Sequence, residues 1–209
     1  KYDSLQPVVN FFTDSEVIYT AANSPYNSLQ DVIAKAKDGM GKWGAANPAS
    51  LERQAAEQLK AAAGVNAAVV THEGGGDLMI NVLNGTLDIG VGEVQELRGQ
   101  LEGKQIRLLA TFNPERMKDF PDVPTVKESG YDVVLQKFRG LAAPKGLPDD
   151  IGAIWDKATQ AVLADPEYQK AYQAESLVPN FIDHASYPAF VNDFADKTAA
   201  FLKQSGVIQ

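Results

Sequence analysis

The stretch with the clearest chemical pattern is residues 69–93, which read VVTHEGGGDLMINVLNGTLDIGVGE. Three consecutive glycines, Gly74, Gly75 and Gly76, follow an apolar run and precede a short segment with helical spacing. Glycines let a backbone approach a ligand closely, and a helix start offers N–H groups with partial positive charge. The segment therefore predicts a cradle for an anion, although three glycines also serve as a plain flexible turn.

A second helix start of the same kind lies earlier in the chain. The short apolar run at residues 42–46 enters Asn47-Pro48-Ala49-Ser50, and a helical pattern then runs to Ala63. Proline suits the first position of a helix, and Asn47 or Ser50 can cap it. Two loops of this type at one sheet edge are typical of a small-molecule site.

The residues do not predict catalysis. His72 and Glu73 are neighbours on a predicted strand end, so their side chains point to opposite faces, and His184 lies far along the chain. The sequence has no HxxxH or GxSxG pattern and no cysteine. We expect a binding protein rather than an enzyme, with no metal and no cofactor.

Composition narrows the function classes further. The formal net charge is -8 and the sequence pI is about 4.8, which argues against nucleic acid as a partner. The absence of cysteine excludes a disulfide framework. Apolar runs stay well below the roughly 18 residues of a membrane span, and the first residues do not resemble a signal peptide.

Strands and helices alternate with short connections along most of the chain. Strand-like runs are expected at residues 16–22, 42–46, 67–71, 87–91, 106–111, 131–135, 138–143 and 177–182, and helices at 29–38, 51–63, 78–83, 94–100, 151–164, 166–175 and 187–203. This alternation predicts an α/β architecture with a largely parallel sheet.

Several segments, in order, resemble a known family. They are PYNSLQDVIAKAK, KWGAANPASLERQAAEQL, GGGDLMINVLNGTLDIGVG, LLAT followed by PDVPTVKESGY, and FRGLAAPKGLP. The chain is similar over nearly its whole length to the extracytoplasmic solute-binding proteins of tripartite tricarboxylate transporters, the TctC or Bug family. The resemblance implies a periplasmic-binding-protein-like fold of type II with two lobes.

The resemblance also implies how the chain is divided. Residues 16–137 would form lobe two, and residues 1–15 with 138–209 the remainder of lobe one, with a hinge near Gln136. The N-terminal part of lobe one is expected to be missing, through cleavage or truncation.

Site residues follow from the resemblance by position. Before the first helix they are Ala46, Asn47 and Ser50, with Arg53 in its first turn. The glycine loop Gly74 to Gly76 and the loop at Gly92 and Glu93 come next, and Phe138 stands where the family often has tryptophan. Ser50 either contacts the ligand or only caps its helix, and Phe138 either lines the cleft or packs in the hinge.

The implied function is capture of a small carboxylated metabolite in the periplasm by a monomeric receptor that delivers it to membrane transporter subunits. The alternative is a ligand-sensing domain of the same fold in a transcription regulator or signalling protein. Glu73, Asp77 and Glu93 would repel a di- or tricarboxylate unless they point away from the cleft.

Overall fold

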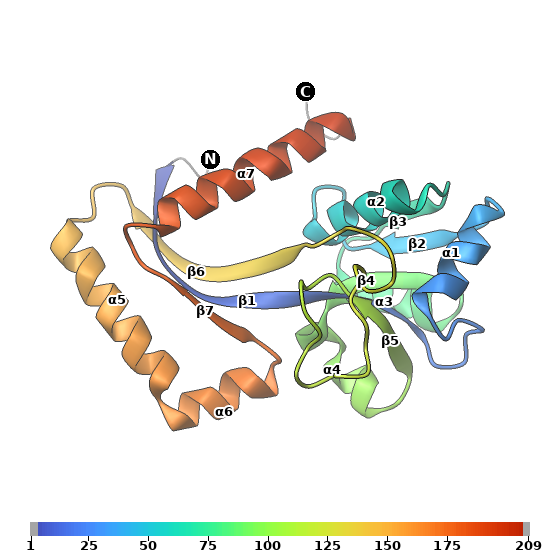
Figure 1. Cartoon of the computed structure of the whole chain (residues 1–209), viewed down its shortest axis with the longest axis horizontal. Coiled ribbons are helices and arrows are strands. Elements are labelled where there is room, and N and C mark those ends of the chain that lie inside the picture. Colours follow the sequence, from blue (N-terminus) through green and yellow to red (C-terminus); the bar gives the residue numbers. More distant parts are fainter. Residues whose placement is uncertain (1–3, 207–209) are drawn as a thin grey trace. The chain divides into compact units, whose positions relative to one another are not determined.

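The computed structural model describes residues 4–206, which divide into two compact units (Figure 1). One unit runs from Ser15 to Gln136, and the other joins the residues up to Asp14 with those from Lys137 onward. Strand β1 (Leu5–Ala21) contributes residues to both units. The chain therefore passes between the units twice.

The unit from Ser15 to Gln136 alternates strands and helices. After β1 it contains α1 (Leu29–Lys37), β2 (Lys42–Ala45), α2 (Leu51–Ala63), β3 (Ala68–Thr71), α3 (Gly75–Leu83), β4 (Ile89–Glu93), α4 (Val94–Glu102) and β5 (Ile106–Thr111). The expected helices are all present in this unit. The first strand is much longer than the expected 16–22, because its first part, including Asn10, Phe12 and Thr13, also pairs with a strand of the other unit.

The sheet of this unit is mixed, in the order β3-β2-β4-β1-β5. β2 is parallel to β3 and to β4, but β1 is antiparallel to β4 and to β5. The prediction of a largely parallel sheet was therefore wrong for β1. The strands joined through helices run the same way, whereas β1 reaches the sheet from the other unit and is inserted between β4 and β5 in the opposite direction.

Each face of this sheet carries its own apolar core. On one face, α1 and α2 pack with Trp43, Ile89, Phe112 and neighbouring residues. On the other face, α3 and α4 pack with Val17, Tyr19 and Met117. Gly44 of β2 permits this second packing, because a Cβ atom there would lie 2.2 Å from Cδ1 of Leu78 on α3.

The second unit contains the first part of β1 and five later elements with their own aromatic contacts. These are β6 (Gln136–Pro144), α5 (Asp149–Ala164), α6 (Pro166–Ala174), β7 (Val178–Ile182) and α7 (Tyr187–Gln204), with β6 and β7 both pairing with β1. Residues 131–135 belong to no strand, and pairing starts at Gln136. Within residues 4–206, no helix combines the length and apolar character needed to cross a membrane.

Candidate functional site

Three helices begin where three neighbouring strands end. β2 leads through residues 46–50 into α2, β3 leads through residues 72–74 into α3, and β4 leads directly into α4. Because β2, β3 and β4 run in the same direction, these helix starts meet at one edge of the sheet. N–H groups at a helix start carry partial positive charge, so this edge suits a polar ligand.

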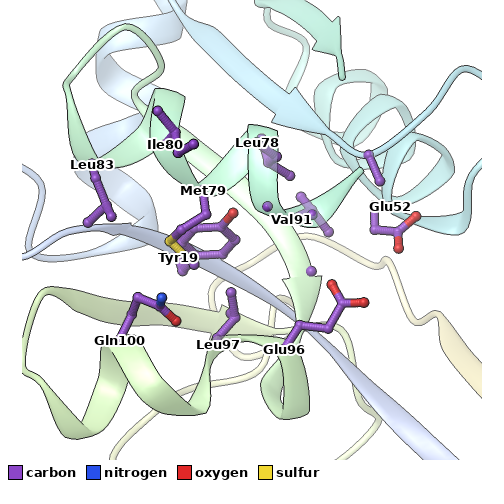
Figure 2. A pocket seen from close by; sticks show the side chains of 14 residues that line it. Tyr19, Glu52, Leu78, Met79, Ile80, Leu83, Val91, Glu96, Leu97 and Gln100 are labelled. Atoms are coloured by element: carbon purple, nitrogen blue, oxygen red, sulfur yellow. The ribbon is translucent and has the colours of Figure 1, made fainter. Parts of the chain in front are cut away.

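A cavity of about 310 Å³ lies at this edge, inside the unit from Ser15 to Gln136. Figure 2 shows side chains of α3 on one side of it, side chains of α4 on the other, and Tyr19 between them. A volume near 300 Å³ is at the lower end of the range for small-molecule sites. Its lining is formed by Tyr19, Ala46, Glu52, Gly75, Gly76, Leu78, Met79, Ile80, Leu83, Val91, Gly92, Glu96, Leu97 and Gln100.

Four of the residues predicted from the sequence line this cavity: Ala46, Gly75, Gly76 and Gly92. They come from the three separate connections named above, so the fold brings the predicted loops together. Gly74 is the N-cap residue of α3, with an extended backbone. A Cβ atom on Gly76 would meet nothing within 4 Å, which leaves open space beside the second residue of the helix.

Asn47, Ser50 and Arg53 are not among the lining residues of the cavity and make local contacts instead. The Ser50 hydroxyl accepts a hydrogen bond from the Arg53 N–H at 3.1 Å and so caps α2. Arg53 donates from Nη1 to the Pro48 carbonyl at 3.0 Å, and Asn47 accepts from the Ala49 N–H at 3.2 Å. Their role as ligand contacts remains a prediction.

Phe138 is on β6 in the second unit, and its ring packs against aromatic side chains of α7. Its ring packs edge-on against Tyr187, Phe190 and Phe194, with ring centroids 6.0, 5.4 and 4.9 Å away. These contacts give the ring a packing role, and a part in ligand binding stays a prediction.

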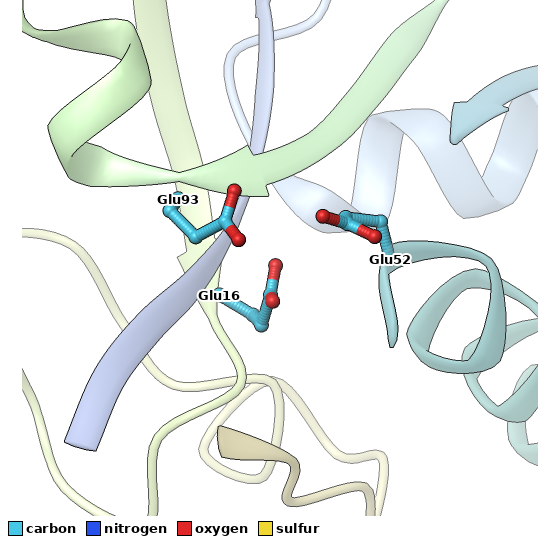
Figure 3. Close-up of side chains that lie close together, drawn as sticks. All are labelled: Glu16, Glu52 and Glu93. Atoms are coloured by element: carbon cyan, nitrogen blue, oxygen red, sulfur yellow. The ribbon is translucent and has the colours of Figure 1, made fainter. Parts of the chain in front are cut away.

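A cluster of three buried carboxylates lies beside the cavity. Glu16 of β1, Glu52 of α2 and Glu93 of β4 place one oxygen each within 4.8 Å of one another, and Figure 3 shows the three side chains converging from these elements. Their exposures are 0, 6 and 1%. Glu52 also lines the cavity, so it joins the cluster to the cavity.

Negative charges on the three carboxylates of this cluster would repel one another. Two unit charges at about 4.8 Å repel by roughly 3.5 kcal/mol at an effective dielectric constant of about 20. Three ionised carboxylates in one buried place therefore require protons or a positive partner. Glu16, Glu52 and Glu93 each have a further interaction within the protein, so none of the three is left without a partner.

The starts of all three helices carry the protein's own acidic residues. Glu52, Asp77 and Glu96 lie in the first turns of α2, α3 and α4, where a negative charge is stabilised. The Glu96 carboxylate lies against Gly75 at the start of α3, since a Cβ atom there would be 2.6 Å from Oε2. Burial, with the Glu96 charge as a second cause, raises the pKa of the Tyr19 hydroxyl, which remains a donor at neutral pH.

Glu73 and Asp77, which flank the three glycines, do not line the cavity. Asp77 accepts from His72, with Nδ1 and Oδ2 2.8 Å apart, and from the Asn81 amide, while Glu73 is exposed. Sequence reasoning considered these residues and missed Glu16, Glu52 and Glu96. The signal for Glu16 was available, because a carboxylate at the start of the apolar run EVIYTAA is unusual.

A second cavity of about 280 Å³ lies near Tyr26 and Asp88. The Asp88 carboxylate accepts from the Tyr26 hydroxyl at 2.6 Å and from the Lys42 N–H at 2.7 Å. The Asp88 carboxylate is therefore engaged in hydrogen bonds that stabilise the fold. None of the residues that line this cavity begins a helix of eight or more residues.

Comparison with known proteins identifies the family. The sequence model of the tripartite tricarboxylate transporter family receptor, TctC, matches residues 1–207. The chain belongs to the TctC family. TctC proteins are periplasmic solute-binding receptors, which confirms the family predicted from the sequence and the expectation of a binding protein rather than an enzyme.

Individual TctC relatives are distant in sequence and close in fold. A UPF0065 protein of Cupriavidus necator is 27% identical over 97% of this chain, which spans 62% of that relative's length. An R. palustris protein solved with adipate has a TM-score of 0.86 at 18% identity, covering 97% of this chain and 69% of that one. MatC of Rhodopseudomonas palustris, solved with bound malate, has a TM-score of 0.74 at 17% identity, covering 94% and 67%. These structures confirm the periplasmic-binding-protein-like α/β fold.

Proposed function

We propose that this protein is an extracytoplasmic solute receptor that captures a small organic carboxylate and presents it to the membrane subunits of a tripartite tricarboxylate-type transporter. The observation that carries the proposal is the cavity of about 310 Å³ where the starts of α2, α3 and α4 meet. Membership of a receptor family supports it, and the adipate and malate in related structures indicate the class of ligand.

In this proposal the ligand carboxylate accepts hydrogen bonds from N–H groups at the start of α3. Gly75 and Gly76 form the first turn there, and neither has a side chain that would cover those groups. Leu78, Met79 and Leu97 supply an apolar wall for the carbon skeleton of the ligand.

The two units are the two lobes of the receptor in this proposal, with residues 16–137 as lobe two. The division of the chain after Asp14 and after Gln136 supports this assignment. Closure of the lobes over the ligand would bend the chain at these two passages, and the closed form is the one the transporter recognises in the periplasm.

The test is ligand binding with a pair of variants at Gly76. Malate and the straight-chain dicarboxylates from malonate to adipate are titrated calorimetrically into the purified protein. Gly76→Asp adds a negative charge to the open space beside the helix start and is expected to weaken the best ligand by about tenfold or more. Gly76→Asn has nearly the same shape without the charge and serves as the matched control.

Both variants should keep the far-UV circular dichroism and melting temperature of the parent. Equal affinities of the Gly76→Asp and Gly76→Asn variants would remove the α3 start from the site. Binding of none of the carboxylates to the parent protein would refute the proposed ligand class.

A further inference from the structure

We propose that the Tyr19 hydroxyl is a ligand contact that sets the specificity of this receptor. It donates a hydrogen bond to an oxygen atom of the ligand that lies away from the carboxylate held at the start of α3. This inference rests on the proposed function and narrows its ligand class. The preferred ligand is then a carboxylate whose carbon chain ends in a second oxygen-bearing group, a hydroxyl or a second carboxylate, rather than a simple alkyl acid.

Tyr19 brings a buried polar group without a partner to the lining of the cavity. The residue is only 1% exposed and yet lines the cavity, and Figure 2 shows its ring between side chains of α3 and side chains of α4. Within residues 4–206, no group forms a hydrogen bond with its hydroxyl. A hydroxyl taken out of water without a partner destabilises a protein, so a ligand oxygen at this place would supply the hydrogen bond that the fold leaves unmade.

The fold fixes the place of this hydroxyl. Tyr19 of β1 pairs with Gly90 of β4, and a Cβ atom on Gly90 would lie 2.5 Å from both Cζ and the hydroxyl oxygen of the tyrosine. The ring therefore lies against the backbone of β4, where only glycine leaves room for it. Leu78, Met79 and Leu97 pack with it in the same apolar core. A donor that is already held in place loses little conformational entropy when a ligand binds.

The surroundings of the hydroxyl favour a ligand oxygen over an alkyl chain at this place. An alkyl chain that displaces water from the Tyr19 hydroxyl leaves this donor unpaired, whereas a ligand oxygen replaces the hydrogen bond to water. Burial, with the Glu96 charge as the second cause, raises the pKa of the hydroxyl, so it stays protonated and donates. Leu78, Met79 and Leu97 line the same cavity, so the carbon chain between the two oxygen-bearing ends of the ligand has an apolar wall.

Calorimetry with matched ligands, titrated into the parent protein and the Tyr19→Phe variant, tests the inference. Butyrate, pentanoate and hexanoate are each compared with the ω-hydroxy acid and the dicarboxylate of the same carbon number. In the parent protein we expect the best ω-hydroxy acid to bind roughly twofold to tenfold more tightly than its alkyl partner, and the best dicarboxylate roughly tenfold to a hundredfold. Tyr19→Phe removes only the hydroxyl oxygen and should reduce these preferences to within about twofold while the alkyl acids keep their affinity.

Tyr26→Phe is the matched control, because it makes the same chemical change in the same unit, outside the lining of this cavity. The Tyr26 hydroxyl donates to the Asp88 carboxylate at 2.6 Å, so its loss should lower the melting temperature by about 4 °C or more and leave the ligand preferences unchanged. Without ligand, Tyr19→Phe should melt at the parent temperature or above it, because a hydroxyl without a partner contributes nothing to stability.

The possible results separate the two proposals. Alkyl acids that bind the parent protein as tightly as their oxygen-bearing partners, or a preference that survives Tyr19→Phe or is lost equally in Tyr26→Phe, overturn the Tyr19 inference and leave the proposed carboxylate function standing. A Tyr19→Phe variant that melts as far below the parent as Tyr26→Phe shows that the hydroxyl already has a partner in the protein, and this result also overturns the inference. Binding of none of the ligands refutes the proposed function, and the inference with it.

Discussion

Replacing Gly44 by alanine should destabilise the unit that contains the site. Gly44 lies in the centre of β2, and its added Cβ atom would be 2.2 Å from Leu78 Cδ1 and 2.6 Å from Leu87 Cδ1. The nearer contact is about 1.3 Å shorter than the roughly 3.5 Å at which two carbon atoms attract each other. Both leucines are almost fully buried, at 1 and 3% exposure, so their methyl groups have little room to retreat.

Overpacking of this kind typically costs about 1–3 kcal/mol. At about 4 °C per kcal/mol for a unit of this size, the melting temperature should fall by roughly 4–12 °C. The measurement is a thermal melt followed by far-UV circular dichroism at about 222 nm, where α-helices give a strong signal. Because Leu78 belongs to α3, the same displacement should also weaken ligand binding at the start of that helix.

Gly74→Ala is the control for a glycine substitution in the same unit. Gly74 has an extended backbone, and a Cβ atom there would meet nothing within 4 Å, so its melting temperature should stay within about 2 °C of the parent value. If Gly44→Ala melts at the same temperature as Gly74→Ala, the close packing of α3 on β2 is not what holds the site in place.

Three further changes test separate parts of the structure. Ser50→Ala removes the side-chain cap of α2 and should lower the free energy of unfolding in urea by about 1 kcal/mol, whereas Ser50→Thr should retain most of it; equal stability of all three proteins would contradict a capping role. Gly99→Ala fills open space on helix α4 and should raise the stability by about 0.5–1 kcal/mol, seen as a higher urea midpoint. His184 donates from Nδ1 to Asp156 at 2.6 Å, and this hydrogen bond raises the pKa of the histidine above 6.5. Its stabilisation should therefore be complete below pH 6.5 and be lost as the pH rises through the raised value, and Asp156→Asn should flatten this dependence of the urea midpoint.

Local patterns in the sequence were enough for the helices and for two of the connections at the site. The Gly74–Gly76 loop and the Ala46–Ser50 loop were recognised because glycine, proline and capping residues act within a few positions of themselves. The structure places Ala46, Gly75, Gly76 and Gly92 around one cavity, and the prediction that they lie at one sheet edge depended only on parallel strands.

The direction of β1 was decided by the tertiary structure alone. In a parallel sheet, Glu16 at the start of its strand would lie at the edge opposite Glu93 at the end of β4. Because β1 enters from the other unit and runs antiparallel, Glu16 pairs with Glu93 and reaches the edge where Glu52 begins α2. Strand direction depends on the path of the whole chain rather than on any local pattern. The sequence by itself therefore determined the family and the glycine-lined helix starts, and only the fold brought Glu16, Glu52 and Glu93 together beside the cavity.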